Sequence, residues 1–144
     1  MYIISACLAG VNCKYSGGNN QDNRIIKLVK EGKGILVCPE QLGGLPTPRL
    51  PSEIVEIEDV KMVRSTDGED VTKEFVKGAE EIIKIAKLMN VKKAILKSKS
   101  PSCGYGKIYD GSFTKTLKSG NGLTAELLIL NGIEVISEET LDQL

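Results

Sequence analysis

Apolar and polar residues follow one another along the chain in a pattern that predicts strands and helices in turn. A continuous apolar run, typical of a strand covered on both faces of a sheet, occurs at residues 34–38, and apolar-rich segments that we also expect to form strands occur at residues 2–7, 91–96 and 133–136. Apolar residues at helical spacing predict helices at residues 20–31, 71–89 and 123–130. Such alternation predicts an α/β fold. We therefore expect a single domain, residues 1–144, with an open, mainly parallel, Rossmann-like sheet in three layers.

Other segments depart from this alternation. Residues 53–57 and 60–65 are expected to form a small antiparallel hairpin. Residues 39–51 contain four prolines and two glycines, a composition that we expect to exclude regular structure. Residues 107–113 are expected to form an irregular strand or turn, and residues 137–142 a short helical tail.

Three of the four cysteines lie where an expected strand passes into a loop. Cys7 and Cys38 end their strands, and Cys103 follows the strand at 91–96 in a loop of serines and glycines. Because the carboxyl ends of parallel strands lie along one edge of a sheet, where such folds bind ligands, we expect these cysteines to meet in one crevice. Free cysteine also packs in cores as a small apolar residue. Core cysteines would occur anywhere along the strands, so the shared position of these three favours a metal site.

The composition narrows the possible chemistry and partners. The chain has no histidine, which excludes His-based acid–base catalysis, Ser–His–Asp triads and His-ligated zinc. Lysine plus arginine and aspartate plus glutamate both number 19, so the net charge gives no basis for broad attraction to nucleic acid or to a membrane. Four tyrosines, two phenylalanines and no tryptophan offer few rings on which bases could stack.

The expected location follows from the apolar runs and the start of the chain. No run approaches the roughly 20 apolar residues of a membrane span. The start, Met1-Tyr-Ile-Ile-Ser5, lacks the basic and apolar regions of a signal peptide. We therefore expect a cytoplasmic protein, in which cysteines indicate metal or redox chemistry rather than structural disulfides.

Thiolate ligands suit zinc or an iron–sulfur cluster. Structural zinc modules usually carry closely spaced cysteine pairs, whereas Cys7 and Cys13 are six residues apart and the other two cysteines stand alone. Three thiolates on separate strand ends could hold three irons of a [4Fe–4S] cluster and leave the fourth iron open. Two alternatives remain: a module that binds or senses a metal without turnover, and a redox or sulfur-carrier protein in which Cys7 and Cys13 form a reversible pair.

Several motifs together resemble a prokaryotic family catalogued as domain of unknown function 523, which includes thiouracil desulfidases. The matching segments are Ser5-Ala-Cys-Leu-Ala-Gly10, Cys13-Lys-Tyr-Ser-Gly-Gly18, Cys38-Pro-Glu-Gln-Leu-Gly-Gly-Leu-Pro-Thr-Pro-Arg49, Leu96-Lys-Ser-Lys-Ser-Pro-Ser-Cys-Gly104, Ile108-Tyr-Asp-Gly-Ser-Phe113 and Gly120-Asn-Gly-Leu-Thr-Ala125. They extend over essentially the whole chain. Ala9 and Ser16 depart from the family pattern, where leucine and aspartate are commoner, but neither position supplies a necessary ligand.

The resemblance implies an α/β protein that binds a [4Fe–4S] cluster through three cysteines and removes sulfur from a thiolated uracil. Carried over by position, the implied ligands are Cys7, Cys38 and Cys103, with Cys13 as an alternative to one of them. The implied partner is a small thiolated base or nucleoside.

The resemblance also implies roles for residues beside the cysteines. Glu40 matches the acid–base residue of the family, and Ser100 and Ser102 match residues that would help to position the substrate; we assign Ser100 to catalysis and Ser102 to substrate binding. As a hypothesis, the open iron binds the thiocarbonyl sulfur while Glu40 activates a water that attacks the ring carbon.

Further substrate contacts are expected from the loops near these residues. Backbone N–H groups of Gly43 and Gly44, and of residues 100–104, could hold the pyrimidine or an attached phosphate. Arg49 and Lys97 are candidate partners for a phosphate or for the charge of the cluster, although each could also be an ordinary solvated cation.

Overall fold

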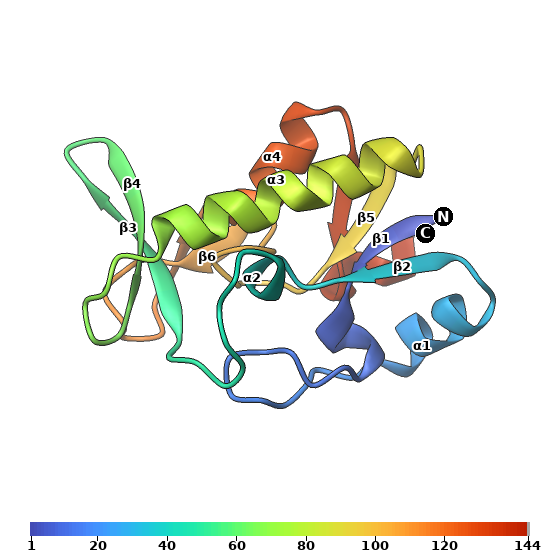
Figure 1. Cartoon of the computed structure of the whole chain (residues 1–144), viewed down its shortest axis with the longest axis horizontal. Coiled ribbons are helices and arrows are strands. Elements are labelled where there is room, and N and C mark those ends of the chain that lie inside the picture. The colour runs from blue at the N-terminus through green and yellow to red at the C-terminus, as the bar shows by residue number, and fades with distance from the viewer. Residues whose placement is uncertain (144) are drawn as a thin grey trace.

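The four strands expected from the apolar-rich segments form one parallel sheet in the computed structural model, which describes residues 1–143 (Figure 1). The strands are β1 (Tyr2–Ser5), β2 (Gly34–Val37), β5 (Lys93–Leu96) and β8 (Glu134–Ser137), in the order β2-β1-β5-β8. Each neighbouring pair is parallel, with Ile3 of β1 opposite Ile35 of β2 and Ala94 of β5. The predicted parallel α/β fold is therefore confirmed.

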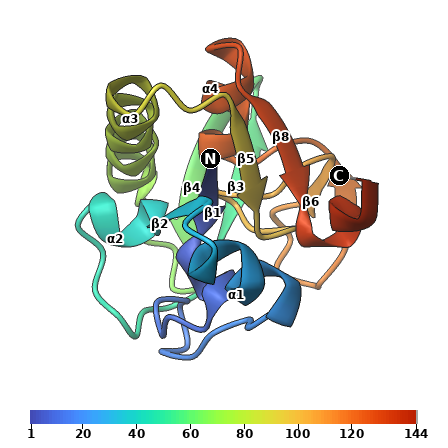
Figure 2. The same cartoon turned by 90° about the vertical axis from the view of Figure 1, so that its right-hand side faces the viewer.

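Helices cover both faces of this sheet (Figure 2). These helices are α3 (Thr72–Leu88) and α4 (Leu123–Leu130) on one face and α1 (Asn23–Lys30) on the other. Successive residues of a strand point to opposite faces, so Ile3 packs with Ile82 of α3 and Leu128 of α4, whereas Ile4 packs with Ile25 of α1. Both strand residues are fully buried, which explains why neighbouring positions of β1 are both apolar. No helix within residues 1–143 is long and apolar enough to cross a membrane.

Two antiparallel hairpins lie outside the main sheet. The expected hairpin is present as β3 (Ser52–Ile57) and β4 (Val60–Ser65), with Glu58 and Asp59 at φ values of 50° and 65° in the turn. Positive φ at both central residues is characteristic of tight two-residue hairpin turns. The second hairpin pairs β6 (Lys107–Tyr109) with β7 (Leu117–Ser119), and the sequence pattern predicted only part of it.

Short helical turns follow the ends of three strands. A 3₁₀ helix, η1 (Ala6–Ala9), follows β1, α2 (Pro39–Leu42) follows β2 after Cys38, and η2 (Glu138–Gln143) follows β8. The expectation that residues 39–51 exclude regular structure is therefore wrong for their first four residues. Pro39 occupies the first turn of α2, where a helix needs no N–H donor and the fixed φ of proline fits the helix.

Two glycines allow α2 to pack closely against α3. A Cβ atom on Gly43 would lie 1.9 Å from the carbonyl oxygen of Glu74 in α3, and a Cβ atom on Gly78 of α3 would lie 1.9 Å from the carbonyl oxygen of Pro39. Both distances are far too short for any side chain. The position of α2, and of Cys38 and Glu40 at its start, is therefore set by this contact between backbones.

Candidate active site

The carboxyl ends of β1, β2 and β5 border a cavity of about 500 Å³ that all four cysteines line. Cys7 lies in η1 just after β1, Cys38 follows β2 directly, and Cys103 lies in the loop that follows β5. Cys13 comes from the long loop between η1 and α1 and is 1% exposed. The structure therefore brings the three strand-end cysteines to one cavity and adds the fourth.

Cys13 interacts with two of the other thiols, those of Cys7 and Cys38. Hydrogen bonding with the Cys13 side chain is the largest cause that lowers the pKa of Cys7 to about 7 and the pKa of Cys38 to about 6. Hydrogen bonding with these two neighbours raises the pKa of Cys13, because a thiol that donates its single proton to a neighbouring thiolate is stabilised in its neutral form. Cys7 and Cys38 therefore reach the thiolate form, which binds metals, at lower pH than an ordinary cysteine.

Cys103 is more buried than Cys7 and Cys38, the other two expected ligands. Burial raises the pKa of the Cys103 thiol to about 12. Its backbone N–H donates to Ser100 Oγ at 2.7 Å. The first turn of α4 fixes the same loop, because the N–H groups of Leu123 and Thr124 donate to the carbonyl oxygens of Pro101 and Ser102, each at 2.9 Å. The Cys103 sulfur is therefore placed by the packing of α4 against its loop.

The donors around this cavity suit an iron–sulfur cluster better than a harder cation. Thiolates are the usual ligands of such clusters and of zinc, whereas magnesium and calcium prefer oxygen. Among residues 1–143, no three His, Cys, Asp or Glu side chains are arranged to hold a single metal ion. The fit therefore rests on four convergent thiols and a cavity large enough for a group of several atoms.

Glu40 lies beside the cysteines with both carboxylate oxygens hydrogen-bonded. Arg49 Nε donates to Oε1 at 3.0 Å, and Ser102 Oγ donates to Oε2 at 3.0 Å. Ser100 Oγ lies 3.4 Å from Ser102 Oγ, so the two serines and the carboxylate are adjacent. The Glu40 side chain is 17% exposed and lines the cavity. The structure thus brings Glu40 of one sequence motif to Ser100 and Ser102 of another, although Glu40 and Ser102 are 62 positions apart in the chain.

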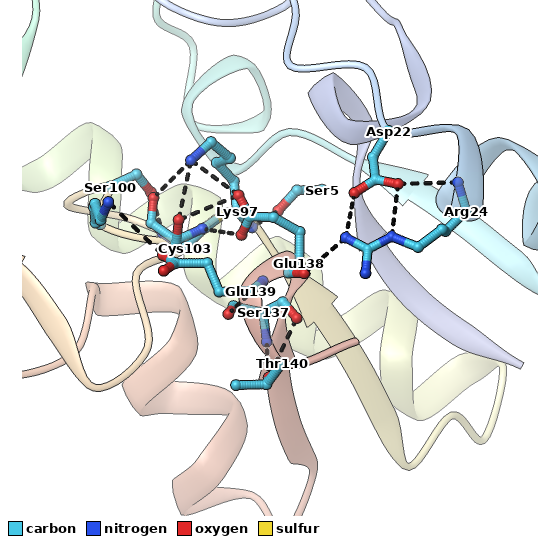
Figure 3. A network of polar contacts seen from close by, with 12 residues as sticks. Ser5, Asp22, Arg24, Lys97, Ser100, Cys103, Ser137, Glu138, Glu139 and Thr140 are labelled. Atoms are coloured by element: carbon cyan, nitrogen blue, oxygen red, sulfur yellow. Dashed lines mark hydrogen bonds and ion pairs between the residues drawn. The ribbon is translucent and has the colours of Figure 1, made fainter. Parts of the chain in front are cut away.

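Lys97 lies on the cavity wall and is held by the segment that follows β8 (Figure 3). Its Nζ lies 3.0 Å from Glu138 Oε2 and donates to Ser98 Oγ at 3.1 Å. The other carboxylate oxygen of Glu138 accepts from the Ser98 N–H at 2.8 Å, and the Glu138 carbonyl accepts from Arg24 at 3.0 Å. Lys97 is therefore a fixed cation rather than a freely solvated one.

Sequence reasoning missed several residues of this site. Glu138 carries no motif and lies 40 residues from Ser98, which it contacts. Asn20 also lines the cavity, and its side-chain hydrogen bond helps to lower the pKa of Cys7 after the larger contribution from Cys13. No local pattern marks either residue, because both act only through contacts made by folding.

Two predicted substrate contacts are not brought to the cavity. Gly43 is buried against α3, and Gly44 is exposed with a φ of 97° at the end of α2. Neither glycine lines the cavity. Gly43 is needed for the close packing of α2 on α3, and Gly44 for a backbone conformation that other residues rarely adopt. We therefore leave both glycines out of the proposed site.

Aromatic and basic side chains complete the cavity wall. Tyr15, Tyr109 and Phe113 line it, as do Lys14, Lys99 and Lys115. These residues come from loops and from β6 that are remote in the sequence. Planar rings of this kind can contact the face of a pyrimidine.

Comparisons with known proteins agree with this arrangement. A family model described as 2-thiouracil desulfurase matches residues 2–140. The uncharacterized protein YbbK of Bacillus subtilis (strain 168) is 43% identical over 150 residues, which span 100% of this chain and 99% of YbbK. A solved structure described as the [4Fe-4S]-dependent thiouracil desulfidase TudS superposes with a TM-score of 0.91 at 41% identity, covering 99% of this chain and 93% of that chain. The chain therefore belongs to the 2-thiouracil desulfurase family, as its motifs predicted.

Proposed function

We propose that this chain is an iron–sulfur-dependent desulfidase that replaces the thiocarbonyl sulfur of a small thiolated pyrimidine with oxygen from water. The observation that carries the proposal is the meeting of four thiols with Glu40 in one cavity at the carboxyl ends of β1, β2 and β5. Family membership supports it, as does the similarity to a structure described as a [4Fe-4S]-dependent thiouracil desulfidase.

The cysteines at the three strand ends are our proposed ligands of a [4Fe–4S] cluster. Cys7 and Cys38 closely follow the adjacent strands β1 and β2, and Cys103 lies in the loop after β5 that hydrogen bonds from α4 hold in place, as a well-ordered metal site requires. Cys13 follows no strand of the sheet, and its hydrogen bonding with Cys7 and Cys38 stabilises its neutral thiol rather than the thiolate that binds a metal, which favours a supporting role. When bound through three thiolates, such a cluster supplies an open iron, a soft Lewis acid with affinity for sulfur.

Side chains beside the three cysteines would activate the water and orient the pyrimidine. The net reaction converts C=S and H₂O into C=O and H₂S, so no oxidant or reductant is needed. Glu40 would take a proton from the water as its oxygen attacks the ring carbon. Ser100 and Ser102 would together orient the Glu40 carboxylate and the pyrimidine. Ser102 donates a hydrogen bond to Glu40, and the Ser100 hydroxyl lies next to the Ser102 hydroxyl. The rings of Tyr109 and Phe113 would lie against the pyrimidine face.

Anaerobic reconstitution of the purified protein tests the proposal. We expect about four irons per chain, a broad absorbance band in the blue, and release of sulfide and uracil from 2-thiouracil in equal amounts. The iron-free protein is the control and should release neither. One tightly bound zinc in place of iron would overturn the cluster. Iron binding without sulfide release would indicate a binding or sensing module, and sulfide release that survives iron removal would indicate thiol-based sulfur transfer.

Two cysteine variants test the ligand assignment. Cys103→Ala should lose most of the bound iron, because a buried thiolate ligand is removed. Cys13→Ala, the matched control, should keep its iron because three ligands remain. Iron loss from Cys13→Ala with retention in Cys103→Ala would reverse the assignment.

A further inference from the structure

The Arg49 guanidinium is buried between Glu40 and the loop that carries Cys13. Its side chain is 7% exposed. Nε donates to Glu40 Oε1 at 3.0 Å, Nη2 donates to the Cys13 carbonyl oxygen at 2.9 Å, and Nη1 donates to the Pro46 carbonyl oxygen at 3.1 Å and to Thr47 Oγ1 at 2.9 Å. Four of its five N–H donors are therefore used by partners within residues 1–143.

This bonding leaves little of Arg49 for a substrate. Arginine recognises a phosphate or a carboxylate best through two parallel N–H donors, and only one donor has no partner among the contacts that the structure describes. Engagement of a substrate anion would break contacts to Glu40 or to the Cys13 loop. The expectation from sequence that Arg49 binds substrate is thus poorly matched by its geometry.

Arg49 and Ser102 each donate a hydrogen bond to a different oxygen of the Glu40 carboxylate. Ser102 Oγ fixes one oxygen at 3.0 Å and Arg49 Nε fixes the other at 3.0 Å. A glutamate side chain has several rotatable bonds, so its carboxylate stays in one place only when such contacts restrict it. Without Arg49, only the hydrogen bond from Ser102 would remain, and the carboxylate could rotate about that single contact.

We propose that Arg49 is a positioning residue that acts through Glu40, holding its carboxylate in the orientation that the reaction needs. The inference rests on the proposed function, because it assumes that Glu40 is the acid–base group and that the reaction rate depends on its orientation. Lysine cannot replace this role fully, since a single ammonium lacks the planar fork that spans the Glu40 carboxylate and the Cys13 carbonyl.

Kinetics of the reconstituted holoenzyme test the inference. Arg49→Ala should lower kcat for 2-thiouracil by about 10²-fold, the effect of a misplacement near 1 Å, while KM and iron content stay close to those of the parent. Millimolar guanidinium should restore part of kcat in Arg49→Ala, because the small cation can occupy the vacated position beside Glu40. Arg49→Lys should fall between the two. Arg64→Ala is the matched control, since Arg64 is a half-buried arginine of β4 that does not line the cavity, and it should leave kcat and guanidinium response unchanged.

Each other outcome is decisive. A parent holoenzyme that releases no sulfide refutes the proposed function itself. An active parent with unchanged kcat in Arg49→Ala overturns the inference. So does a rise in KM at constant kcat, which would make Arg49 a substrate contact. Loss of iron or of thermal stability in both Arg49→Ala and Arg49→Lys, without guanidinium rescue, would make Arg49 a structural support of the Cys13 loop and would also overturn it.

Discussion

Replacement of Gly78 by alanine is expected to destabilise the protein, although alanine favours helices. In an open helix, this change would raise the free energy of unfolding by about 1 kcal/mol. Here the added Cβ would lie 1.9 Å from the Pro39 carbonyl oxygen, whereas ordinary contact begins at 3.4 Å, so α2 must move by the difference, about 1.5 Å. The obstacle is backbone, which no rotamer change relieves.

The change in the free energy of unfolding follows from two opposing effects, overpacking against α2 and the higher helix propensity of alanine. Overpacking of this kind costs about 1–3 kcal/mol, and we take the upper end because the contact is with backbone. After the gain of about 1 kcal/mol in helix propensity, the net loss is about 2 kcal/mol. For a chain of this size, that corresponds to a fall in Tm of roughly 4–8 °C. Because α2 begins with Pro39 and Glu40, the shift should also lower kcat by about 10²-fold.

Thermal unfolding followed by circular dichroism measures the first effect, and sulfide release measures the second. Gly18→Ala is the matched control, because a Cβ atom at Gly18 would meet only side chains, at 3.5 and 3.6 Å. The free energy of unfolding of that variant should stay within about 0.5 kcal/mol of the parent value. The reasoning is refuted if Gly78→Ala is as stable as the parent or more stable.

Two further predictions concern the chemistry of the cavity. Glu40→Gln should retain its iron but lower kcat by at least about 10²-fold, because an amide cannot take a proton from water; full activity would remove Glu40 from the mechanism. In the iron-free protein, the rate at which iodoacetamide modifies Cys38 should rise as the pH increases through about 6, since the hydrogen bond from Cys13 lowers the pKa of Cys38 to about 6. Cys103, whose pKa burial raises to about 12, should stay unmodified under the same conditions; peptide mass spectrometry would reveal equal modification of the two thiols, which would contradict the assignment.

Local patterns predicted the main elements because each element has a simple periodicity. The four strands of the sheet are segments rich in apolar residues, and α3 repeats apolar residues at helical spacing. The short elements were harder to predict. A four-residue helix such as α2 is too short to show a period, and its proline suggested irregular structure although proline is tolerated in a first turn. The three-residue β7 has no alternation that marks it as a strand.

Some predictions for individual site residues agreed with the structure and others did not, and the difference depends on whether the topology of the sheet alone places the residue. Cys7, Cys38 and Cys103 were brought to one cavity, because parallel strands place their carboxyl ends on one edge. Gly43 was predicted to contact substrate from its glycine-rich neighbourhood, yet it serves the packing of α2 on α3. Arg49 was expected to bind substrate because it is a cation near the motif, whereas its donors are used within the chain.

The sequence by itself determined which segments form the main strands and helices, where the cysteines lie relative to them, and which family the motifs indicate. These properties depend on residues close together in the chain. Only the tertiary structure decided the strand order β2-β1-β5-β8 and the partners of the polar groups in the cavity. Ser102 donates to Glu40 across 62 residues, and Ser98 donates to Glu138 across 40. A hydrogen bond needs two groups within about 3 Å in a suitable direction, and for such distant residues only the packing of the whole fold sets that distance.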